Sequence, residues 1–469
     1  MKKLSVIITF LSVCLNLLGQ TYSSELYNAA QSGDANSQFD LALCYHYGYG
    51  VVQDRSKALY WTLQAANNGS IAAQYNVGWY YENGEGTKAN QYTAYHWYKK
   101  AAEAGDPSGE FALARCYENG IGVAKDPEEA IKWYKKAAID GNPDAQVHMG
   151  VAYLFGLGIN NDGFLSTYWF RKAAEQNDPA GLYWLGECYE NGVGVDKDES
   201  VALSYYRRSA EHGFDLAQVA MAKDALRKDE YVTGVNWLKK AANQGNSDAE
   251  ILLGLCHENG WGVSQSIWEA KHYYENAGTH GNSSGYFHIG RLYANENSSI
   301  YSLPSAFDWY MKAAKDDNAQ AQGIVAYMYL AGNGVAENSS EGLRWLNKAC
   351  ENEDPWALAI GGMLYYDGLE NIPKDYSKAF RYLTKAYESD DVDESMRDKV
   401  IEYLANCYQY GRGTTRNTYK ASELRKLITP TSATTVNRSQ KQSPQNPQPK
   451  TKKTGKKKSL PSWEDKIKK

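Results

Sequence analysis

Apolar and polar positions along most of the chain form two helical patterns that return at a fixed interval. The stretch "AQYNVGWYYENG" (73–84) has apolar side chains about every fourth residue and ends at a glycine. The stretch "KDPEEAIKWYKKAA" (125–138) also has an apolar stripe, and Asp126 and Pro127 stand where an N-cap and a first helical residue belong. Apolar positions at this spacing predict amphipathic α-helices. The sequence therefore predicts helices in pairs.

A pair of glycines marks the end of the first helix in most units. The pairs are 36 residues apart through the first five units and return later: Gly48/Gly50, Gly84/Gly86, Gly120/Gly122, Gly156/Gly158, Gly192/Gly194, Gly260/Gly262, Gly332/Gly334 and Gly411/Gly413, with a single Gly368 before the last. A glycine closes a helix because it adopts the left-handed conformation at little cost. One helix pair cannot bury its own apolar face, so this repetition predicts an all-α solenoid of stacked units.

The pattern gives eleven helix pairs, preceded by one capping helix at "SELYNAAQSG". The sixth unit (214–245) is four residues shorter and has "LRKDEYVTG" where the glycine pair would stand. The eighth unit has "ANENSSIYS" there, and the junction of the tenth and eleventh units contains the insertion "DDVDESMRD". The pattern does not fix the local curvature of these units.

The motif small-x-x-x-Leu/Val-Gly-x-x-Tyr-x-x-Gly-x-Gly-Val, followed by Lys-Ala-x-x-Trp-Tyr-x-Lys-Ala-Ala-x-x-Gly, resembles the Sel1-like repeat, a longer relative of the tetratricopeptide repeat. The resemblance covers about residues 23–428 and is strongest in units two to five. It implies a curved superhelix of about eleven helix-turn-helix repeats with a 36-residue period, whose first helices line a concave surface. It also implies an adaptor that assembles protein partners along that surface.

Comparison of equivalent positions in the eleven units separates core from surface. One position in the first helix is apolar in ten of the eleven units and is predicted to face the core: Cys44, Tyr80, Cys116, Ala152, Cys188, Asp224, Cys256, Leu292, Met328, Leu364 and Cys407. Helix pairs stack roughly 10 Å apart, so sulfurs in different units lie beyond disulfide reach. The cysteines are therefore predicted to be reduced and buried.

The position just before this one changes its character from unit to unit, which indicates that the core does not determine it. Together with a variable position one turn earlier, it forms the predicted partner-binding groove: Leu43, Asn76, Trp79, Arg115, His148, Trp184, Glu187, Arg291 and Tyr327. Protein interfaces favour Trp, Tyr and Arg. The alternative is that these are solvated positions without a role. A recurrent glutamine at Gln38, Gln74, Gln146, Gln218 and Gln322 is interpreted as a structural hydrogen-bonding position.

Residues 1–19 have the features of a secretory signal peptide. Lys2 and Lys3 precede an apolar run from Leu4 to Leu18 that is too short and too polar for a membrane span. A lipoprotein signal that would lipidate Cys14 is the alternative. We expect a soluble product, exported to the periplasm or the medium of a bacterial host.

The composition changes after residue 428. Residues 429–469 contain eleven Lys or Arg and two Asp or Glu, a net charge of +9, whereas the whole chain has −5 and residues 1–428 therefore −14. Few apolar residues and a high net charge predict a disordered tail. We expect the tail to bind an anionic envelope surface through Lys450, Lys452, Lys453, Lys456, Lys457 and Lys458. Binding to nucleic acid or to its own acidic solenoid are the alternatives.

No motif in the sequence indicates catalysis. It contains no phosphate-binding loop, paired-carboxylate site, nucleophile elbow or metal cluster, and its eight histidines fall at unrelated registers. Acidic residues gather in loops such as "DKDES" and "ENGVG", where helix capping and solubility explain them. We expect no cofactor, no metal, no small-molecule substrate and a monomer.

The predicted organisation is a signal peptide (1–19), a repeat solenoid (20–428) and a basic tail (429–469). The predicted function is that of an exported, non-enzymatic interaction scaffold whose tail tethers it to an anionic surface. The alternative function is an envelope enzyme with an unrecognised site, either a cell-wall hydrolase or a β-lactam-processing protein.

Overall fold

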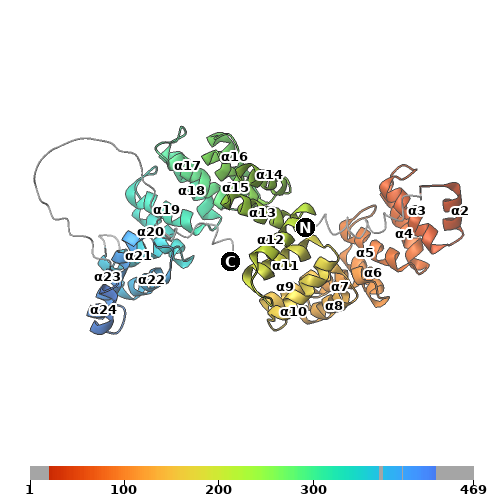
Figure 1. Ribbon diagram of the computed structural model, residues 1–469, viewed down its shortest axis with the longest axis horizontal. Coiled ribbons are helices and arrows are strands. Elements are labelled where there is room, and N and C mark those ends of the chain that lie inside the picture. Colours follow the sequence, from red (N-terminus) through yellow and green to blue (C-terminus); the bar gives the residue numbers. More distant parts are fainter. Residues whose placement is uncertain (1–20, 369–372, 393, 429–469) are drawn as a thin grey trace, which may run out of the picture. The chain divides into compact units, whose positions relative to one another are not determined.

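The computed structural model describes residues 21–368, 373–392 and 394–428. The regular structure of these residues consists of 23 helices, α2 to α24, which follow one another along the chain (Figure 1). The prediction of an all-α solenoid is confirmed. The chain divides into two compact units, residues 1–244 and 245–469, and each is described by itself.

The first unit begins with a single helix, α2 (Ser24–Gln31), and continues with six helix pairs. The first helix of each pair is named the A helix and the second the B helix. The A helices are α3 (Ala35–Tyr47), α5 (Ile71–Asn83), α7 (Pro107–Asn119), α9 (Pro143–Phe155), α11 (Pro179–Asn191) and α13 (Asp215–Arg227). The B helices are α4 (Arg55–Asn67), α6 (Gln91–Glu103), α8 (Pro127–Ile139), α10 (Gly163–Glu175), α12 (Glu199–Glu211) and α14 (Tyr231–Ala242).

The second unit contains five further pairs, so that the described chain has the predicted capping helix and eleven repeats. Its A helices are α15 (Ser247–Asn259), α17 (Ser284–Ala294), α19 (Ala319–Ala331), α21 (Pro355–Asp367) and α23 (Glu394–Tyr410). Its B helices are α16 (Ile267–Thr279), α18 (Leu303–Lys315), α20 (Ser339–Glu351), α22 (Tyr376–Glu388) and α24 (Thr418–Arg425). Repeats are numbered 1 to 11 in chain order.

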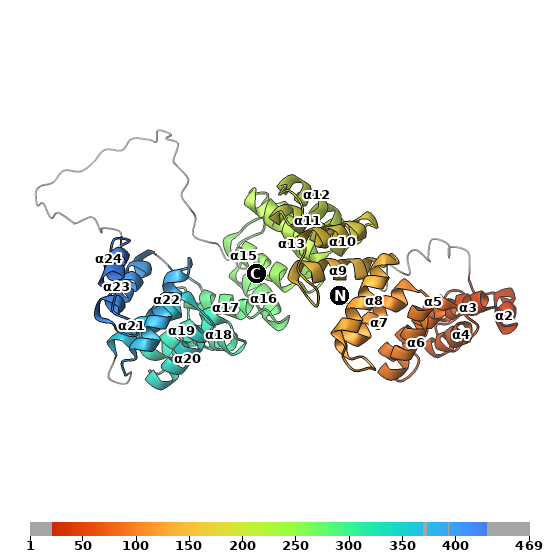
Figure 2. The same ribbon diagram turned by 90° about the horizontal axis from the view of Figure 1, so that it is seen from below.

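Within each unit every helix packs against its neighbours in sequence, and some successive A helices also touch each other (Figure 2). In the first unit α5 contacts α7 and α9 contacts α11. In the second unit α19 contacts α21 and α21 contacts α23. The A helices of a unit therefore share one surface, which we name the A face.

The glycine pair fits each turn against the preceding repeat. Gly84 closes α5 in the left-handed conformation, with φ 71°, and its N–H donates to the Tyr80 carbonyl at 2.9 Å. Gly86 also has a positive φ, and a Cβ at this position would overlap the carbonyl oxygen of Arg55, the first residue of α4. The second glycine thus brings the turn into backbone contact with the previous B helix, which any side chain would prevent.

The three irregular repeats each have a distinct structural solution. In repeat 6, three residues join α13 to α14, and Asp229 takes the left-handed conformation with φ 61° in place of a glycine. In repeat 8, α17 has 11 residues and ends at Asn295 in extended backbone. The second part of the insertion before repeat 11 lengthens α23 to 17 residues, while residues 390–392 form a turn in front of it.

The repeated core consists of alanines and large aromatic rings between the A and B helices. Tyr98, Tyr134, Tyr274 and Phe170 are among the largest fully buried side chains. The cysteine position faces the core as predicted, with Cys116 only 1% exposed, although its equivalents in repeats 6 and 10 lie at the edge of the core or are half-buried. The described residues form no disulfide, and six cysteines are buried: Cys44, Cys116, Cys188, Cys256, Cys350 and Cys407.

Candidate functional site

The A face carries eight of the nine residues predicted for the groove. Arg291 and Tyr327 are exposed, and six others are half-buried: Asn76, Trp79, Arg115, His148, Trp184 and Glu187. The expectation of a groove-facing side chain is wrong for Leu43, which is 6% exposed. Leu255 at the same register is buried as well, at 7%. Side-chain length alone does not determine exposure at this register, because the shorter Val151 is half-buried, as are Trp79 and Arg115.

A recurrent carboxylate–phenol pair lies beneath this row of residues. Glu82, near the end of α5, accepts a hydrogen bond from Tyr98 of α6 at 2.6 Å. Arg115 of the next A helix, α7, donates to the same carboxylate at 3.0 Å. The arrangement recurs in the second unit, where Glu258 accepts hydrogen bonds from Tyr274 and Arg291, each at 2.8 Å. Both arginines are therefore held by the preceding repeat and present their guanidinium groups in a fixed position.

These glutamates are residues whose role the sequence analysis missed. Glu118 accepts from Tyr134 at 2.7 Å and Glu190 from Tyr206 at 2.6 Å, so the acid of the "ENG" motif binds a buried phenol. The explanation by capping and solubility is wrong for these residues. The signal was present in the chain, because the residue 16 positions before Phe170 is Leu154 and not Glu. The carboxylate occurs beneath four of the tyrosines at this register, where it accepts from the hydroxyl, although Tyr310 has Ala294 at the same spacing.

Two histidines occupy one register of the A helices, so the interpretation of unrelated registers is wrong for this pair. His148 stacks on Tyr134, with ring centroids 3.9 Å apart, and its Nε2 lies 3.6 Å from Glu118. His288 stacks on Tyr274 at 4.8 Å. Burial lowers the pKa of His148, and burial together with the charge of Arg291 lowers the pKa of His288 to about 3. Both imidazoles are therefore neutral at pH 7.

Trp184 and Glu187 form the A-face surface of repeat 5. The Trp184 ring stacks on Phe170 of α10, with centroids 5.6 Å apart and planes at 10°. Glu187 accepts a hydrogen bond from Tyr206 at 2.7 Å, beside the bond that Tyr206 makes to Glu190. Burial first, and then the negative charge of Glu187, raises the pKa of Tyr206, so that it stays a donor. An indole face and a carboxylate are thus fixed side by side on α11.

Asp144 is an A-face group that the sequence analysis did not single out. It stands in the first turn of α9, one turn before His148. Burial, and then the charge of Asp178, raises the pKa of Asp144 to about 6, and Arg115 opposes this shift. Its carboxyl group thus titrates close to neutral pH. Partial burial caused this shift, and burial of a polar residue in the first turn of a helix leaves no mark in the sequence.

The buried cysteines have no reactive character. Burial raises the pKa of Cys116 and of Cys256 to about 12. A thiol acts as a nucleophile only as the thiolate, which these surroundings disfavour. These side chains are core residues.

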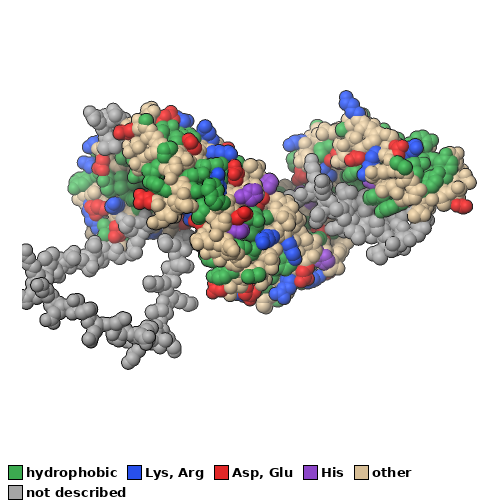
Figure 3. All heavy atoms as spheres, turned by 90° about the horizontal axis from the view of Figure 1, so that it is seen from above, with side chains coloured by type: hydrophobic (Ala, Val, Ile, Leu, Met, Phe, Trp, Pro, Cys, Tyr) green, Lys and Arg blue, Asp and Glu red, His purple; other side chains and the backbone are tan. Residues whose placement is uncertain are grey.

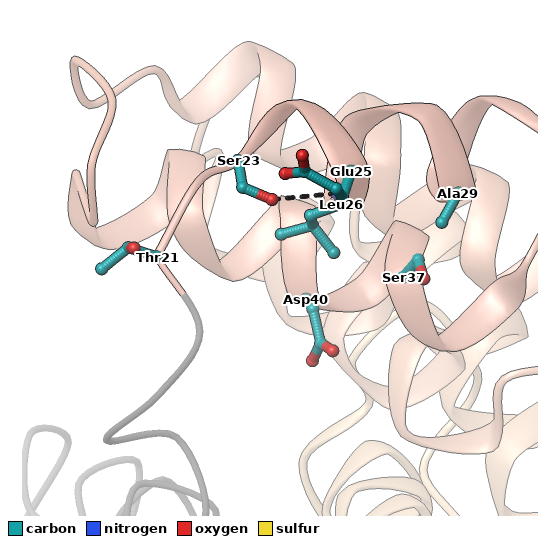
Figure 4. A pocket seen from close by; sticks show the side chains of 7 residues that line it. All are labelled: Thr21, Ser23, Glu25, Leu26, Ala29, Ser37 and Asp40. Atoms are coloured by element: carbon teal, nitrogen blue, oxygen red, sulfur yellow. Dashed lines mark hydrogen bonds between the residues drawn. The ribbon is translucent and has the colours of Figure 1, made fainter.

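An open depression of about 440 Å³ lies at the start of the first unit (Figure 4). It is lined by α2, α3 and the residues before them: Thr21, Ser23, Glu25, Leu26, Ala29, Ser37 and Asp40. Ser23 accepts from the Leu26 N–H at 3.1 Å and thereby caps α2. Backbone and side-chain hydrogen bonds lower the pKa of Glu25, whereas burial raises that of Asp40. Ser23 thus has a capping role, whereas Thr21, Ser37 and Asp40 do not cap α2 or α3.

Some predictions lie outside the described residues. These are the signal peptide with Cys14, and the tail with Lys450, Lys452, Lys453, Lys456, Lys457 and Lys458. Within the described part of the chain, no helix is long and apolar enough to span a bilayer. The same residues contain no group of three or more His, Cys, Asp or Glu placed to hold a metal ion.

The described A face offers arginines, imidazoles, carboxylates and aromatic rings, each fixed by contacts with a neighbouring helix. The ring centroids of Trp79 and His46 lie 5.8 Å apart, and the Tyr327 ring lies edge-on to Trp356 with centroids 6.2 Å apart. Such groups bind by ion pairing, hydrogen bonding and aromatic contact.

Comparison with known proteins identifies the repeat. The Sel1 repeat model matches the chain eleven times, at residues 35–70, 71–106, 107–142, 143–178, 179–214, 220–246, 247–282, 283–318, 319–354, 356–391 and 401–424. A search of curated proteins gives no match.

Three solved structures are similar to this chain. The first is c5321, "a protective antigen present in uropathogenic Escherichia coli strains displaying an SLR fold", with 28% identity over 87% of this chain and 90% of that chain and a TM-score of 0.57. A Sel1 repeat protein from Oxalobacter formigenes has 29% identity over 51% of this chain and 96% of that one, with a TM-score of 0.46. A putative Sel1 repeat protein from Klebsiella pneumoniae subsp. pneumoniae has 27% identity over 41% and 94%, with a TM-score of 0.29.

The matched segments coincide with the helix pairs of the structure, the glycine turns and the alanine-rich packing between A and B helices included. The protein therefore belongs to the Sel1 repeat family.

Proposed function

We propose that this protein is an exported adaptor without enzymatic activity, which binds protein partners on its A face. Sel1 repeat scaffolds generally mediate protein–protein interactions and are typically non-enzymatic. One observation carries the proposal: the backbone of the A helices repeats, while the side chains at their surface positions differ between repeats. Repeat 2 has Asn76 and Trp79 at these positions, repeat 4 has His148 and repeat 9 has Tyr327. A constant frame with varied side chains suits the recognition of particular partners.

The bonds beneath the A face support a binding role. Arg115 and Arg291 are each fixed by a glutamate of the preceding repeat, and Trp184 is fixed by Phe170. Side chains that are already ordered lose less conformational entropy when a partner binds. Trp and Arg are also the residues that most often dominate binding energy at protein interfaces.

Export is proposed on two grounds. Residues 1–19 have the charge and apolar pattern of a secretory signal. The similar c5321 is described as a protective antigen, and exposure to the outside of the cell would fit that description.

The A-face proposal is tested with two matched triple variants of the full chain. Asn76→Ala, Trp79→Ala and Tyr327→Ala remove A-face side chains that form no ion pair between repeats. Tyr60→Ala, Tyr92→Ala and Tyr419→Ala remove aromatic side chains of B helices that are 54%, 64% and 74% exposed. Proteins cross-linked to each variant in the cell envelope are identified by mass spectrometry.

We expect the first variant to lose the captured proteins and the second to retain them. Thermal melts serve as the control for folding: removal of the exposed tyrosines should cost no more than about 1 kcal/mol, whereas the half-buried Trp79 packs against core residues and its removal should cost more. Equal capture by both variants, or loss in the second alone, would place the binding surface elsewhere.

We also propose that residues 429–469 tether the protein to an anionic surface. Their net charge of +9 stands against −14 in residues 1–428, and a lysine near an anionic membrane contributes about 1 kcal/mol. Truncation after Ile428 should abolish binding to vesicles that contain anionic lipid and leave the melt unchanged. Binding by the full chain should fall steeply with salt. Equal binding of the truncated chain, or binding indifferent to salt, would remove the tether.

A further inference from the structure

Repeats 9 and 10 have an apolar surface on the A face. On α21, Trp356, Ile360 and Met363 stand at i, i+4 and i+7, which is one side of a helix. On α19, Ile324 and Tyr327 occupy positions equivalent to the last two. Tyr327 is 49% exposed and the other four side chains are half-buried. We name these five residues the apolar A patch.

The five side chains form one continuous surface. Their helices α19 and α21 are in contact, and the Trp356 ring lies edge-on to Tyr327 at 6.2 Å. Trp356 also lies against Gly323, where a Cβ would stand 3.5 Å from the indole. The indole of Trp356 therefore lies close to the backbone of α19 at Gly323. The patch therefore spans both repeats.

The repeat itself does not require apolar residues at these positions. Equivalent positions in repeats 2 to 5 hold polar or charged side chains in many cases, including Asn76, Arg115, Asp144, His148 and Glu187. Figure 3 shows a face on which both hydrophobic and charged side chains lie at the surface. Five adjacent large apolar side chains at a surface mark a place where another segment or molecule binds.

The chain contains a segment whose pattern matches the patch. In "LPSWEDKIKK" (460–469), Trp463 and Ile467 stand four residues apart and are followed by Lys468 and Lys469. The stripe on α21 continues from Met363 to the exposed Asp367. The segment thus has an apolar pair followed by lysines, and α21 has an apolar stripe followed by a carboxylate, so the two patterns are complementary in charge.

The path of the chain also favours this segment over other occupants. The described residues end at Ile428, just after α24, and α24 contacts α23, which contacts α21. Residues 429–459 connect this point to the segment. A flexible linker of that length has a root-mean-square span of roughly 30 Å, comparable with three repeats at about 10 Å each. The linker therefore gives the segment a high effective concentration at the patch.

We propose that residues 460–469 bind the apolar A patch of the same chain, with Trp463 and Ile467 covering Tyr327, Trp356 and Met363. The segment competes with protein partners for this part of the A face. The lysines between residues 450 and 458 remain outside the contact and stay available to an anionic surface.

Photo-cross-linking of the full chain tests the contact directly. The photoreactive amino acid p-benzoylphenylalanine replaces Trp463, and cross-linked peptides are mapped by mass spectrometry. We expect cross-links within one chain to α19 and α21, in a yield that does not change when the protein is diluted tenfold. Cross-links between chains, cross-links only to added lipid vesicles, or no cross-link to α19 or α21 would each overturn the proposal.

A peptide titration measures the contribution of the patch. The probe is a synthetic peptide of residues 459–469, added to the full chain carrying Trp463→Ala and Ile467→Ala. Adding Tyr327→Ala and Met363→Ala should weaken peptide binding at least tenfold. Tyr419→Ala, which removes an aromatic side chain of α24 that is 74% exposed, is the matched control and should leave binding unchanged. Equal binding to all three proteins would contradict the proposed contact, whether or not partners use the rest of the A face.

Discussion

A glutamine at one position of the A helix ties three helices together. Gln38 of α3 donates to the Ala30 carbonyl of α2 at 3.0 Å and accepts from Asn68 at the end of α4 at 2.9 Å. The donor bond to the carbonyl eight residues earlier recurs at Gln74, Gln146, Gln218 and Gln322, with distances of 3.0 to 3.5 Å. The structural role predicted for this glutamine is confirmed.

Glu110 stands at the glutamine position of repeat 3, and Glu110→Gln should stabilise the protein. Its side chain is fully buried, Oε1 contacts Lys136, and Oε2 has no hydrogen-bond partner among the described residues. A glutamine keeps the acceptor for Lys136 and adds a donor for the Ala102 carbonyl. An unsatisfied buried polar atom costs about 1–3 kcal/mol, so we expect a gain of about 1 kcal/mol in urea unfolding.

The reverse change is the control. Gln146→Glu removes the donor to Ala138 and buries a carboxylate, so it should lower the stability. A lower unfolding midpoint for Glu110→Gln would show that the charge on Glu110 stabilises the fold.

The buried His288 should make the stability fall in acid. Its pKa in the folded protein is lowered from 6.5 to about 3, mainly by burial and also by Arg291, while Glu258 lies nearby on the same Arg291. The unfolded chain takes up the proton below pH 6.5 and the folded chain does not. Stability is therefore complete above pH 6.5 and declines between pH 6.5 and 3, by up to about 1.4 kcal/mol for each pH unit.

His288→Phe tests this assignment, because phenylalanine keeps the stacking on Tyr274. Urea unfolding of the variant between pH 7 and 4 should show a shallower decline than that of the natural chain. An identical pH dependence in both proteins would contradict the assignment to His288.

The connections between helices depend on glycine for two separable reasons. Gly122 has φ 70°, and a Cβ there would overlap the Gln91 carbonyl of repeat 2. Gly105, which precedes α7, has φ 83°, but nothing lies within 4 Å of a Cβ at that position. Gly122 is therefore required both for its left-handed conformation and for close packing, whereas Gly105 is required for its conformation alone.

Alanine at these two glycines should therefore have different costs. Gly105→Ala should lose about 1–2 kcal/mol, the cost of a left-handed residue with a Cβ. Gly122→Ala should lose about 1–3 kcal/mol more, because the overlap forces repeats 2 and 3 apart. Both are measured by urea unfolding, and equal losses would show that the turn does not limit the stacking.

The helices and their ends could be predicted from sequence because local chemistry determines them. The Asp126 cap, Pro127 and the left-handed glycines are local signals, and the structure has them at the predicted places. The surface row could be predicted only in part. Whether a side chain such as Leu43 reaches the surface depends on the side chains packed around it, and Arg115 forms a bridge to Glu82 of another repeat.

The molecule as a whole consists of repeats that each contact mainly their neighbours, grouped into two units. In such a fold the apolar positions determine how the repeats stack, and the side chains at the A-face positions can vary without disturbing the stacking. The sequence therefore predicts the architecture well and the partner poorly. The binding chemistry resides in residues such as Trp79 and Tyr327, whose identity the core does not determine.

Site-specific photo-cross-linking in the cell envelope tests most directly whether partners bind the A face. The photoreactive residue is placed at Trp79 or Trp184 on A helices, and at Tyr60 or Tyr419 on B helices. We predict that protein adducts form from the two A-helix positions and not from the two B-helix positions. Adducts of equal or greater yield from Tyr60 and Tyr419 would contradict an A-face binding surface.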